Sequence, residues 1–338
     1  TLFVLPILYI MFEKGINLKP KKIKSITTIM VLGLLFSFQS TDAQEIISID
    51  KAIETALSNN IKIKNEKLNS EYLQKMTKTG YDISNTGIIG EFGQFNSNAN
   101  DVKIGISQSI KFPTVYKRQK QLLIEEAKKG QWNEALQRKE LTRQVTIVFY
   151  EMMYLKEKEK LLLKSDSIYS EFLRKTALRF DKGESNILEK ATAENQSGQI
   201  KIQLLELQSD YKIIQSQLKY LLNTDKDFVP VSDKLKMDFT ENLDKNAIGN
   251  QPSIKLFEQE VNSSKAEISL EKSKKLPELI GGVYYQTFKT NAEFQNSYNG
   301  VYGQFGVAIP LFNAAINNKK KALEINTQIA ENNLIEYK

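Results

Sequence analysis

The segment VKIGISQSIKFP at residues 102–113 decides the fold, because a second version of it, VYGQFGVAIPLF, appears at residues 301–312. Each version closes a predicted strand hairpin, and each hairpin follows a helical stretch that opens at a short turn signal. These signals are Asn59-Asn60-Ile61 in the first copy and Asn250-Gln251-Pro252 in the second. The predicted unit is helix, strand hairpin, helix, repeated. Repeats usually bury their faces against neighbouring copies. Here some neighbours must come from other chains, which predicts a ring.

The closing strands of both hairpins have one apolar face and one more polar face. The residues predicted to face lipid are Val102, Ile104, Ile106, Ile110, Phe112, Val301, Phe305, Val307, Ile309 and Leu311. Gln108 interrupts the first set, and polar or small residues alternate with both sets. This alternation suits a strand between lipid and a wet lumen, and about ten residues span the apolar layer when tilted. Two hairpins give four strands, whose edges lipid does not tolerate, so several copies are expected to share one barrel.

Aromatic residues cluster on the second hairpin. They are Tyr284, Tyr285, Phe288, Phe294, Tyr298 and Tyr302. An interfacial belt of a membrane barrel has this composition. Ordinary strands also favour tyrosine and phenylalanine, so both interpretations stay open.

Two predicted helices after the first hairpin carry matching apolar seams. Four-three spacing is kept by Leu141, Val145, Val148, Met152, Leu155 and Leu162, and again by Leu204, Leu207, Tyr211, Ile214, Leu218 and Leu221. This is the spacing of a coiled coil. A continuous helix from about Tyr116 to Leu178 would be roughly 95 Å long. Between the seams, Gly183 can supply a left-handed turn, and Ser185 or Asn186 can cap the next helix, so the chain is expected to double back there.

The composition excludes several function classes. The 338 residues contain no histidine and no cysteine, which removes the commonest acid-base residue, the thiol nucleophile and most transition-metal ligands. We therefore expect neither an enzyme nor a cofactor. The net charge is +7, but lysine and glutamate interleave along the predicted helices without a clustered basic face, so nucleic-acid binding is not expected.

The first 43 residues contain two membrane signals. Residues 1–12 are apolar and begin without methionine, as in the end of a membrane span. A basic linker follows, and then an apolar run from Ile26 to Phe38 that closes on small residues resembling a signal-peptidase site. By the positive-inside rule the linker would stay in the cytoplasm and everything after Gln44 would be exported. An upstream extension translated by mistake is the alternative.

Two resemblances follow from these residues. Residues 1–14, TLFVLPILYIMFEK, resemble the end of the last transmembrane helix of a heavy-metal-type RND efflux pump, in which a Leu-Pro-x-Leu-Tyr turn precedes the cytoplasmic tail. Residues 44–338 resemble the TolC family of outer-membrane efflux channels over nearly their whole length. Residues 15–43 would then be a basic linker and a signal-like segment. The expected channel domain comprises a first repeat at about 48–222, a connector at 223–250 and a second repeat at 251–338 that lacks its long helices.

The TolC resemblance implies a mainly α fold with β hairpins, in which three chains contribute four strands each to one barrel. It implies an outer-membrane exit duct in a Gram-negative envelope, with a periplasmic adaptor and an RND pump as partners. Heavy-metal cations as the substrate class are implied by the pump-tail resemblance of residues 1–14 alone. The turn would be the adaptor-docking tip, formed by Arg179, Phe180, Gly183, Ser185 and Leu188. Glu189 would be a candidate gate acid, in a place where many such channels carry an aspartate.

Two other classes remain open. A periplasmic adaptor also has a long helical hairpin, but it should lack duplicated barrel strands. A coiled-coil scaffold of an envelope complex should lack both the alternating strands and the export signal.

Overall fold

The computed structural model describes residues 45–95, 100–231, 249–288 and 298–338. The chain divides into two units, Thr1–Glu45 and Ile46–Lys338, and the fold below is that of the second. The expectations for residues 1–14 and 15–43 lie outside the described residues, as do most of the connector and Phe294.

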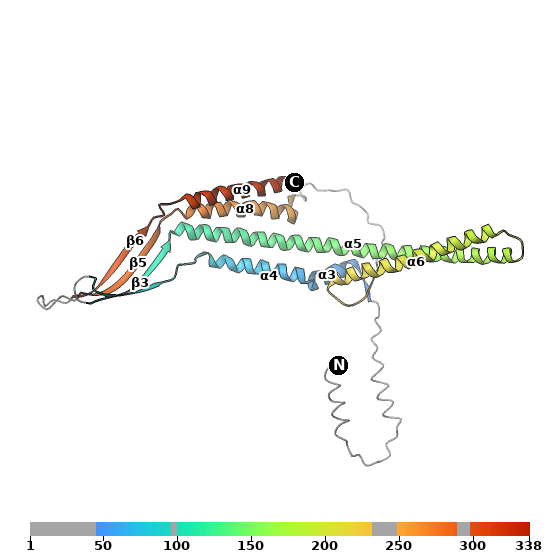
Figure 1. Ribbon diagram of the computed structural model, residues 1–338, viewed down its shortest axis with the longest axis horizontal. Coiled ribbons are helices and arrows are strands. Elements are labelled where there is room, and N and C mark those ends of the chain that lie inside the picture. The colour runs from blue at the N-terminus through green and yellow to red at the C-terminus, as the bar shows by residue number, and fades with distance from the viewer. Residues whose placement is uncertain (1–44, 96–99, 232–248, 289–297) are drawn as a thin grey trace, which may run out of the picture. The chain divides into compact units, whose positions relative to one another are not determined.

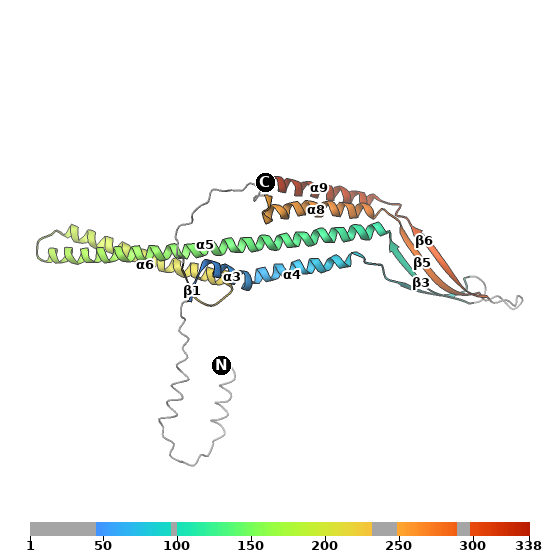
Figure 2. The same cartoon turned by 180° about the vertical axis from the view of Figure 1, so that it is seen from behind.

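The expected order of helix, strand hairpin and helix occurs twice (Figures 1 and 2). The first set is α4 (Ile61–Met76), the short 3-10 helix η1 (Thr77–Gly80), β2 (Gly87–Gly93), β3 (Asp101–Lys111) and α5 (Pro113–Asp181). The second set is α8 (Pro252–Ser273), β5 (Glu278–Phe288), β6 (Tyr298–Ala308) and α9 (Ala314–Tyr337). The remaining elements are β1 (Glu45–Ile47), α3 (Ile49–Asn59), α6 (Ile187–Leu222) and β4 (Phe228–Pro230). The mainly α class with β hairpins is confirmed.

The long helix is continuous and slightly longer than expected. Its 69 residues rise about 104 Å at about 1.5 Å each. Pro113 begins it, because proline lacks the N–H that the first helical position leaves unbonded anyway. Among the helices of the described ranges, none combines the length and the apolar character that crossing a membrane would need.

The predicted seams form the core between α5 and α6. All six seam residues of α5 and five of the six on α6 belong to one apolar cluster, while Leu204 stays outside it. Met152 and Leu218 are almost fully buried at its centre. Ala52 and Ala56 of α3 close the same cluster from the side. The coiled-coil prediction is therefore confirmed, because four-three spacing keeps one apolar stripe of each helix facing the other helix.

The two hairpins form one antiparallel sheet in the order β2-β3-β5-β6. The helices pack in the corresponding order, because α5 lies between α4 and α8, and α8 lies against α9. The strand order β2-β3-β5-β6 therefore matches the helix order α4-α5-α8-α9, because each strand is next in the chain to the corresponding helix (Figure 1). Within the described residues β2 and β6 are the sheet edges, and α4 and α9 are the edges of the helical layer.

Three residues expected on the strand face lie outside the strands. Phe112 is the residue before the first turn of α5, while Ile309 and Leu311 follow the end of β6 at Ala308. The pairing of β5 with β6 stops at Glu278 opposite Ala308, next to Pro277 and Pro310. Proline has no backbone N–H to donate to a ladder, so Pro277 and Pro310 limit the pairing at this end of the sheet.

The connector is not wholly irregular in its described part. Asn223 ends α6 in the left-handed conformation with φ of 51°. β4 then pairs with β1, and the Val231 N–H donates to the Ile47 carbonyl at 3.0 Å.

Candidate functional site

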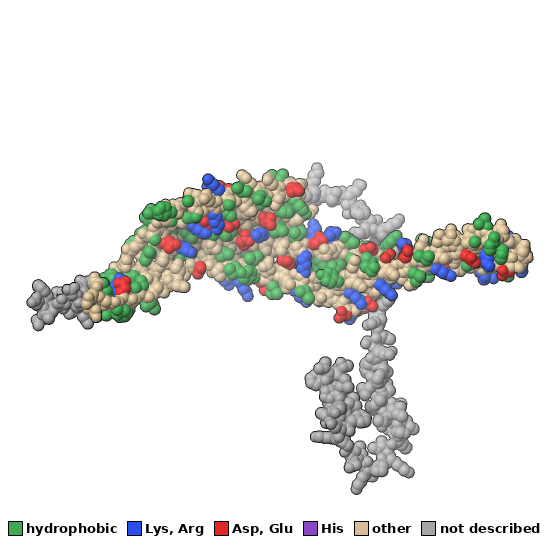
Figure 3. Space-filling model, in the orientation of Figure 1, with side chains coloured by type: hydrophobic (Ala, Val, Ile, Leu, Met, Phe, Trp, Pro, Cys, Tyr) green, Lys and Arg blue, Asp and Glu red, His purple; other side chains and the backbone are tan. Residues whose placement is uncertain are grey.

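The four-stranded sheet has one strongly apolar exposed face. Residues opposite one another in a ladder point to the same face, and the register aligns Ile88 with Ile106, Ile106 with Val283, and Val301 with Tyr285. The exposed apolar members of this face are Ile88, Phe92, Ile104, Ile106, Ile110, Val283, Tyr285, Val301, Phe305 and Val307. Ile88 is 80% exposed and Phe305 is 75% exposed. So large an apolar surface marks a contact with lipid or protein, and hydrophobic side chains are visible at the strand end of the molecule in Figure 3.

The interruption of this face at Gln108 has a local explanation. The Gln108 amide donates to the Ser84 carbonyl at 2.5 Å and accepts from the Thr86 hydroxyl at 2.7 Å. The segment before β2 thus satisfies the amide, which removes the desolvation penalty of a polar group on an apolar surface.

The opposite face carries mostly polar and small side chains, with Ile89 and Ile280 among them. Lys103 pairs with Glu91 at 3.3 Å, and the Ser109 hydroxyl donates to Glu278 at 3.2 Å. Hydrogen-bonded charged groups with glycines between them form a hydrophilic wall, which suits contact with water.

Two of the expected belt aromatics lie on this polar face. The Tyr284 ring lies over Gly105 and Gly282. A Cβ on Gly105 would be 2.1 Å from this ring. Tyr302 stacks on Tyr284 with ring centroids 5.4 Å apart, and the Lys103 ammonium lies 5.0 Å from the Tyr284 centroid. An aromatic ring lying across strand glycines occupies the space that their missing side chains leave.

The belt interpretation is therefore wrong for Tyr284 and Tyr302, because even-numbered positions of this hairpin face the polar side. Tyr285 does lie on the apolar face, 43% exposed. The side chains of Phe288 and Tyr298 are outside the described part of the chain.

The turn between α5 and α6 forms the tip at the far end of α5 from the sheet (Figure 1). Gly183 adopts φ of 76°, as a left-handed helix C-cap requires. The Glu184 N–H donates to the Arg179 carbonyl at 2.8 Å, and the Gly183 N–H donates to the Phe180 carbonyl at 2.9 Å. Asn186 then caps α6 by accepting from the Glu189 N–H at 2.9 Å. Of the two residues that could have capped α6, the structure therefore uses Asn186.

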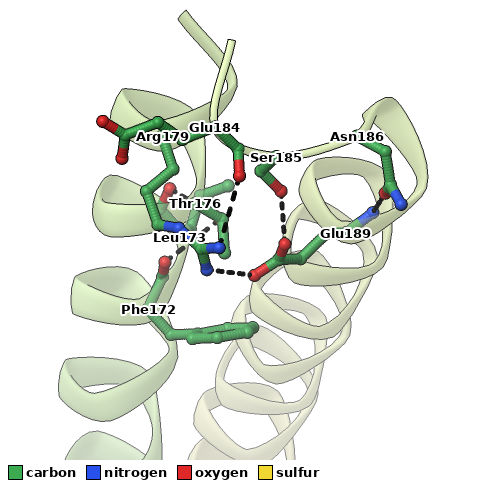
Figure 4. A network of polar contacts seen from close by, with 8 residues as sticks. All are labelled: Phe172, Leu173, Thr176, Arg179, Glu184, Ser185, Asn186 and Glu189. Atoms are coloured by element: carbon green, nitrogen blue, oxygen red, sulfur yellow. Dashed lines mark hydrogen bonds and ion pairs between the residues drawn. The ribbon is translucent and has the colours of Figure 1, made fainter. Parts of the chain in front are cut away.

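A side-chain clasp closes the tip, and Figure 4 shows its members pointing toward one another. The Arg179 guanidinium bonds Glu189 at 2.9 Å and the Glu184 carbonyl at 3.4 Å. The Ser185 hydroxyl donates to the second Glu189 oxygen. Glu189 lies in the first turn of α6, where a carboxylate is favourable. The clasp therefore links the last turn of α5 to the first turn of α6.

The other predicted tip residues lie around this clasp. The Lys190 ammonium is 5.1 Å from the Phe180 ring centroid. Leu188 is 72% exposed and makes no part of the clasp, and Ile187 beside it is also exposed. Sequence reasoning missed the Arg179 to Glu189 pair, although opposite charges on either side of a glycine turn were a usable signal.

Next to the tip the α5 and α6 interface changes from large apolar residues to small and polar ones. Thr176, Ala193 and Ser197 are almost fully buried there. The Ser197 hydroxyl and one Asp166 carboxylate oxygen are buried without a hydrogen-bond partner among the described residues. Unpartnered buried polar atoms reduce stability, and the seam side of the hairpin also has two, on Tyr211 and Gln215, within the described residues.

No protein-family model and no curated protein matches the chain. Solved structures do match. The outer-membrane channel OprN matches with TM-score 0.70 and 12% identity, over 85% of this chain and 70% of that one. CusC, described in connection with transmembrane channel formation, matches with TM-score 0.67 and 16% identity, over 89% and 75%. The outer-membrane channel CmeC of Campylobacter jejuni matches with TM-score 0.67 and 15% identity, over 85% and 67%.

At these identities the likeness establishes the fold. The chain therefore adopts the TolC-like channel fold.

Proposed function

We propose that this chain is the outer-membrane channel subunit of a tripartite efflux system and forms a passive exit duct across the periplasm. The observation that carries the proposal is the two-faced, open-edged sheet at one end of a helix about 104 Å long. The fold shared with solved outer-membrane channels supports it.

The barrel would be closed by three copies. β2 and β6 have unpaired edges within the described residues, and an unpaired edge in lipid leaves backbone groups without partners. Pairing β6 of one copy with β2 of the next satisfies these groups and keeps the apolar faces outward. The helical layers would join in the same sense, α9 to α4 of the next copy.

The tip would be the inner end of the duct and the docking point of a periplasmic adaptor. Leu188, exposed beside Phe180 and the turn at Gly183, offers an apolar contact, and Arg179 with Ser185 would hold the turn in shape. Glu189 is the proposed gate acid. Its bonds to Arg179 and Ser185 are short-range contacts that a docked partner could exchange for its own.

An RND pump would supply the driving force, and residues 1–14 would be the end of its last membrane helix, followed by the linker and signal-like segment at 15–43. Heavy-metal cations are the substrate class that this attachment suggests. The described residues contain no cluster of three or more metal-ligating side chains. In this proposal the pump selects and the duct conducts.

Single-cysteine labelling tests the arrangement, because the natural sequence has no cysteine. Phe305→Cys and Val307→Cys lie on the apolar face, while Gln304→Cys and Gly306→Cys are their neighbours on the polar face. In purified protein reconstituted into vesicles, a lipid-soluble probe should label the first pair. A water-soluble, membrane-impermeant thiol reagent should label the second pair and reduce single-channel conductance.

Equal labelling of both pairs by the water-soluble reagent would contradict the lipid-facing assignment. A protein that remains a soluble monomer without detergent would contradict the duct itself and would favour an adaptor or scaffold.

A further inference from the structure

We propose that the helix–strand junctions form a basic collar that binds the phosphate headgroups of anionic phospholipids. The residues of this collar are 78–82, 111–120, 271–278 and 309–321. Together these four segments are called the junction band, and the collar is the basic surface that they form. The inference rests on the proposed function, because it requires the apolar sheet face to contact lipid.

Charge is concentrated in the junction band. Its basic residues are Lys78, Lys111, Lys117, Arg118, Lys120, Lys272, Lys274, Lys275, Lys319, Lys320 and Lys321. Against these eleven stand three acids, Asp82, Glu271 and Glu278. The band therefore carries a net charge of +8, whereas the whole chain carries +7. At the other end of α5, residues 171–195 contain five basic and five acidic residues and are neutral. The excess of positive over negative charge is therefore greater at the sheet end of the helices than at the tip, although Figure 3 shows lysines and arginines along their whole length.

The band follows the edge of the apolar surface. Lys117, Arg118 and Lys120 lie in the first turns of α5, Lys272 lies in the last turn of α8, and residues 319–321 lie near the start of α9. About two helical turns separate the farthest of these from the helix end, roughly 11 Å. Lysine and arginine stems extend several ångströms and place their charge at the level of the headgroups.

The collar presents charge on both sides of the helical layer. Successive helix residues are about 100° apart, so three consecutive lysines at 319–321 span about 200° of the α9 surface. Lys117, Arg118 and Lys120 span about 160° of the α5 surface. The lysines of α9 therefore reach both faces of the layer, whereas those of α5 lie on nearly half of its surface.

Most of this charge is not neutralised inside the protein. Glu271, almost fully buried, forms ion pairs with Lys274 at 2.8 Å and with Lys319 at 3.4 Å. Lys320 forms an ion pair with Glu324 at 3.1 Å. Within the described ranges, six basic residues of the band have no ion pair, no side-chain hydrogen bond and no ring contact: Lys78, Lys111, Lys117, Arg118, Lys272 and Lys321. All six are exposed.

The side chains between the strands and the lysines are those of a membrane interface. Phe312 is 95% exposed and Leu311 is 78% exposed, close to the α9 lysines in the chain. Tyr81 and Tyr116 stack with centroids 6.2 Å apart, and the Lys120 ammonium lies 5.4 Å from the Tyr81 centroid. Exposed apolar residues beside a row of lysines suit an acyl chain below a phosphate. They do not suit a free anion in water.

The test uses the full chain and a variant chosen to leave folding intact. Lys117→Gln, Arg118→Gln and Lys321→Gln together remove three charges that have no ion partner in the described structure. The matched control is Lys182→Gln, Lys201→Gln and Lys212→Gln, three exposed lysines away from the band and likewise unpaired there. Each protein is reconstituted in phosphatidylethanolamine alone or mixed with phosphatidylglycerol. It is then extracted in detergent, and the retained lipid is quantified by mass spectrometry.

The wild type and the control should retain phosphatidylglycerol above its bulk share, and the junction variant should lose about fivefold or more of this enrichment. Equal enrichment in all three proteins overturns the collar. So does complete displacement of the lipid by inorganic phosphate, which would assign the site to a free anion. A change in oligomeric state with unchanged lipid retention would assign the band to contacts between copies. Channel conductance of the same preparations separates the two proposals. If only the lipid-binding proposal is wrong, the wild type still conducts. If the wild type does not insert into the vesicles at all, the duct proposal is contradicted.

Discussion

At the scale of single residues, glycines decide two local geometries. Gly183 is held at φ of 76° in the tip, whereas Gly198 lies inside α6 with open space where a Cβ would be. Alanine at Gly183 should reduce stability by about 1 kcal/mol, because left-handed backbone is strained for residues with a Cβ. Alanine at Gly198 should raise stability by up to about 1 kcal/mol, since it favours helix. Denaturant unfolding of both variants in detergent measures the two stability changes, which should have opposite signs. Equal changes in the free energy of unfolding would contradict the assignment of Gly183 to a left-handed turn.

The second position is Gly105, whose missing side chain leaves room for the Tyr284 ring. Gly105→Ala places a Cβ against the Tyr284 ring and should reduce the stability of the assembled sheet by about 1–3 kcal/mol through overpacking. Gly281→Ala is the control, because nothing lies within 4 Å of its added Cβ. The temperature at which detergent-solubilised protein loses its β signal in circular dichroism should fall for the first variant only.

At the scale of elements, the seam between α5 and α6 forms the centre of the hydrophobic cluster. Met152→Ala should reduce the free energy of unfolding by about 2–5 kcal/mol, because it removes a fully buried side chain and leaves a cavity. Leu161→Ala, 64% exposed on the same helix, should change it by no more than about 0.5 kcal/mol. Chemical unfolding followed at a helical signal measures both, and equal effects would place the core elsewhere.

The contact between α5 and α8 depends on a carboxylate. The Gln259 amide donates to Glu125 at 2.6 Å, and the Lys128 ammonium is 3.2 Å from it. Burial raises the pKa of Glu125, but the bonds from Gln259 and Lys128 outweigh burial and leave the pKa below its ordinary value of 4.5.

A lowered folded-state pKa means that this stabilisation is present above about pH 4.5 and is lost as the pH falls below it through the folded value. Glu125→Gln should therefore be less stable than the wild type at pH 7, and the difference should shrink in acid. Thermal unfolding of both proteins across this range measures the effect. A difference that does not depend on pH would show that the charge of Glu125 contributes nothing.

At the scale of the whole molecule, the proposed duct requires the apolar face of the sheet to contact lipid. Phe305→Asp puts a charge on that face and should oppose membrane insertion by about 2 kcal/mol or more, with the largest effect at mid-depth. Gln304→Asp, one residue away on the polar face, should be tolerated. Envelope fractionation with immunoblotting compares the two, and equal recovery in the outer membrane would contradict the proposed orientation.

Much of the architecture was predictable because it depends on short-range periodicity. The period of two along residues 102–110 and the four-three seams of α5 and α6 depend only on which side chains recur on one face. The strand ends were less predictable. Phe112, Ile309 and Leu311 continue the apolar alternation but lie beyond the pairing, since prolines end the ladder. Side-chain alternation continues across such a point although backbone pairing does not.

The sequence by itself determined the repeated unit, the coiled-coil hairpin, the turn at Gly183 and the two-faced strands, because each arises from residues close together in the chain. Only the tertiary structure decided that Tyr284 lies across Gly105, that Glu125 meets Gln259, and that basic residues from four separate segments form one band. These contacts join residues far apart in the sequence, and the pairing of β3 with β5 brings the two repeats together. No local pattern encodes that pairing.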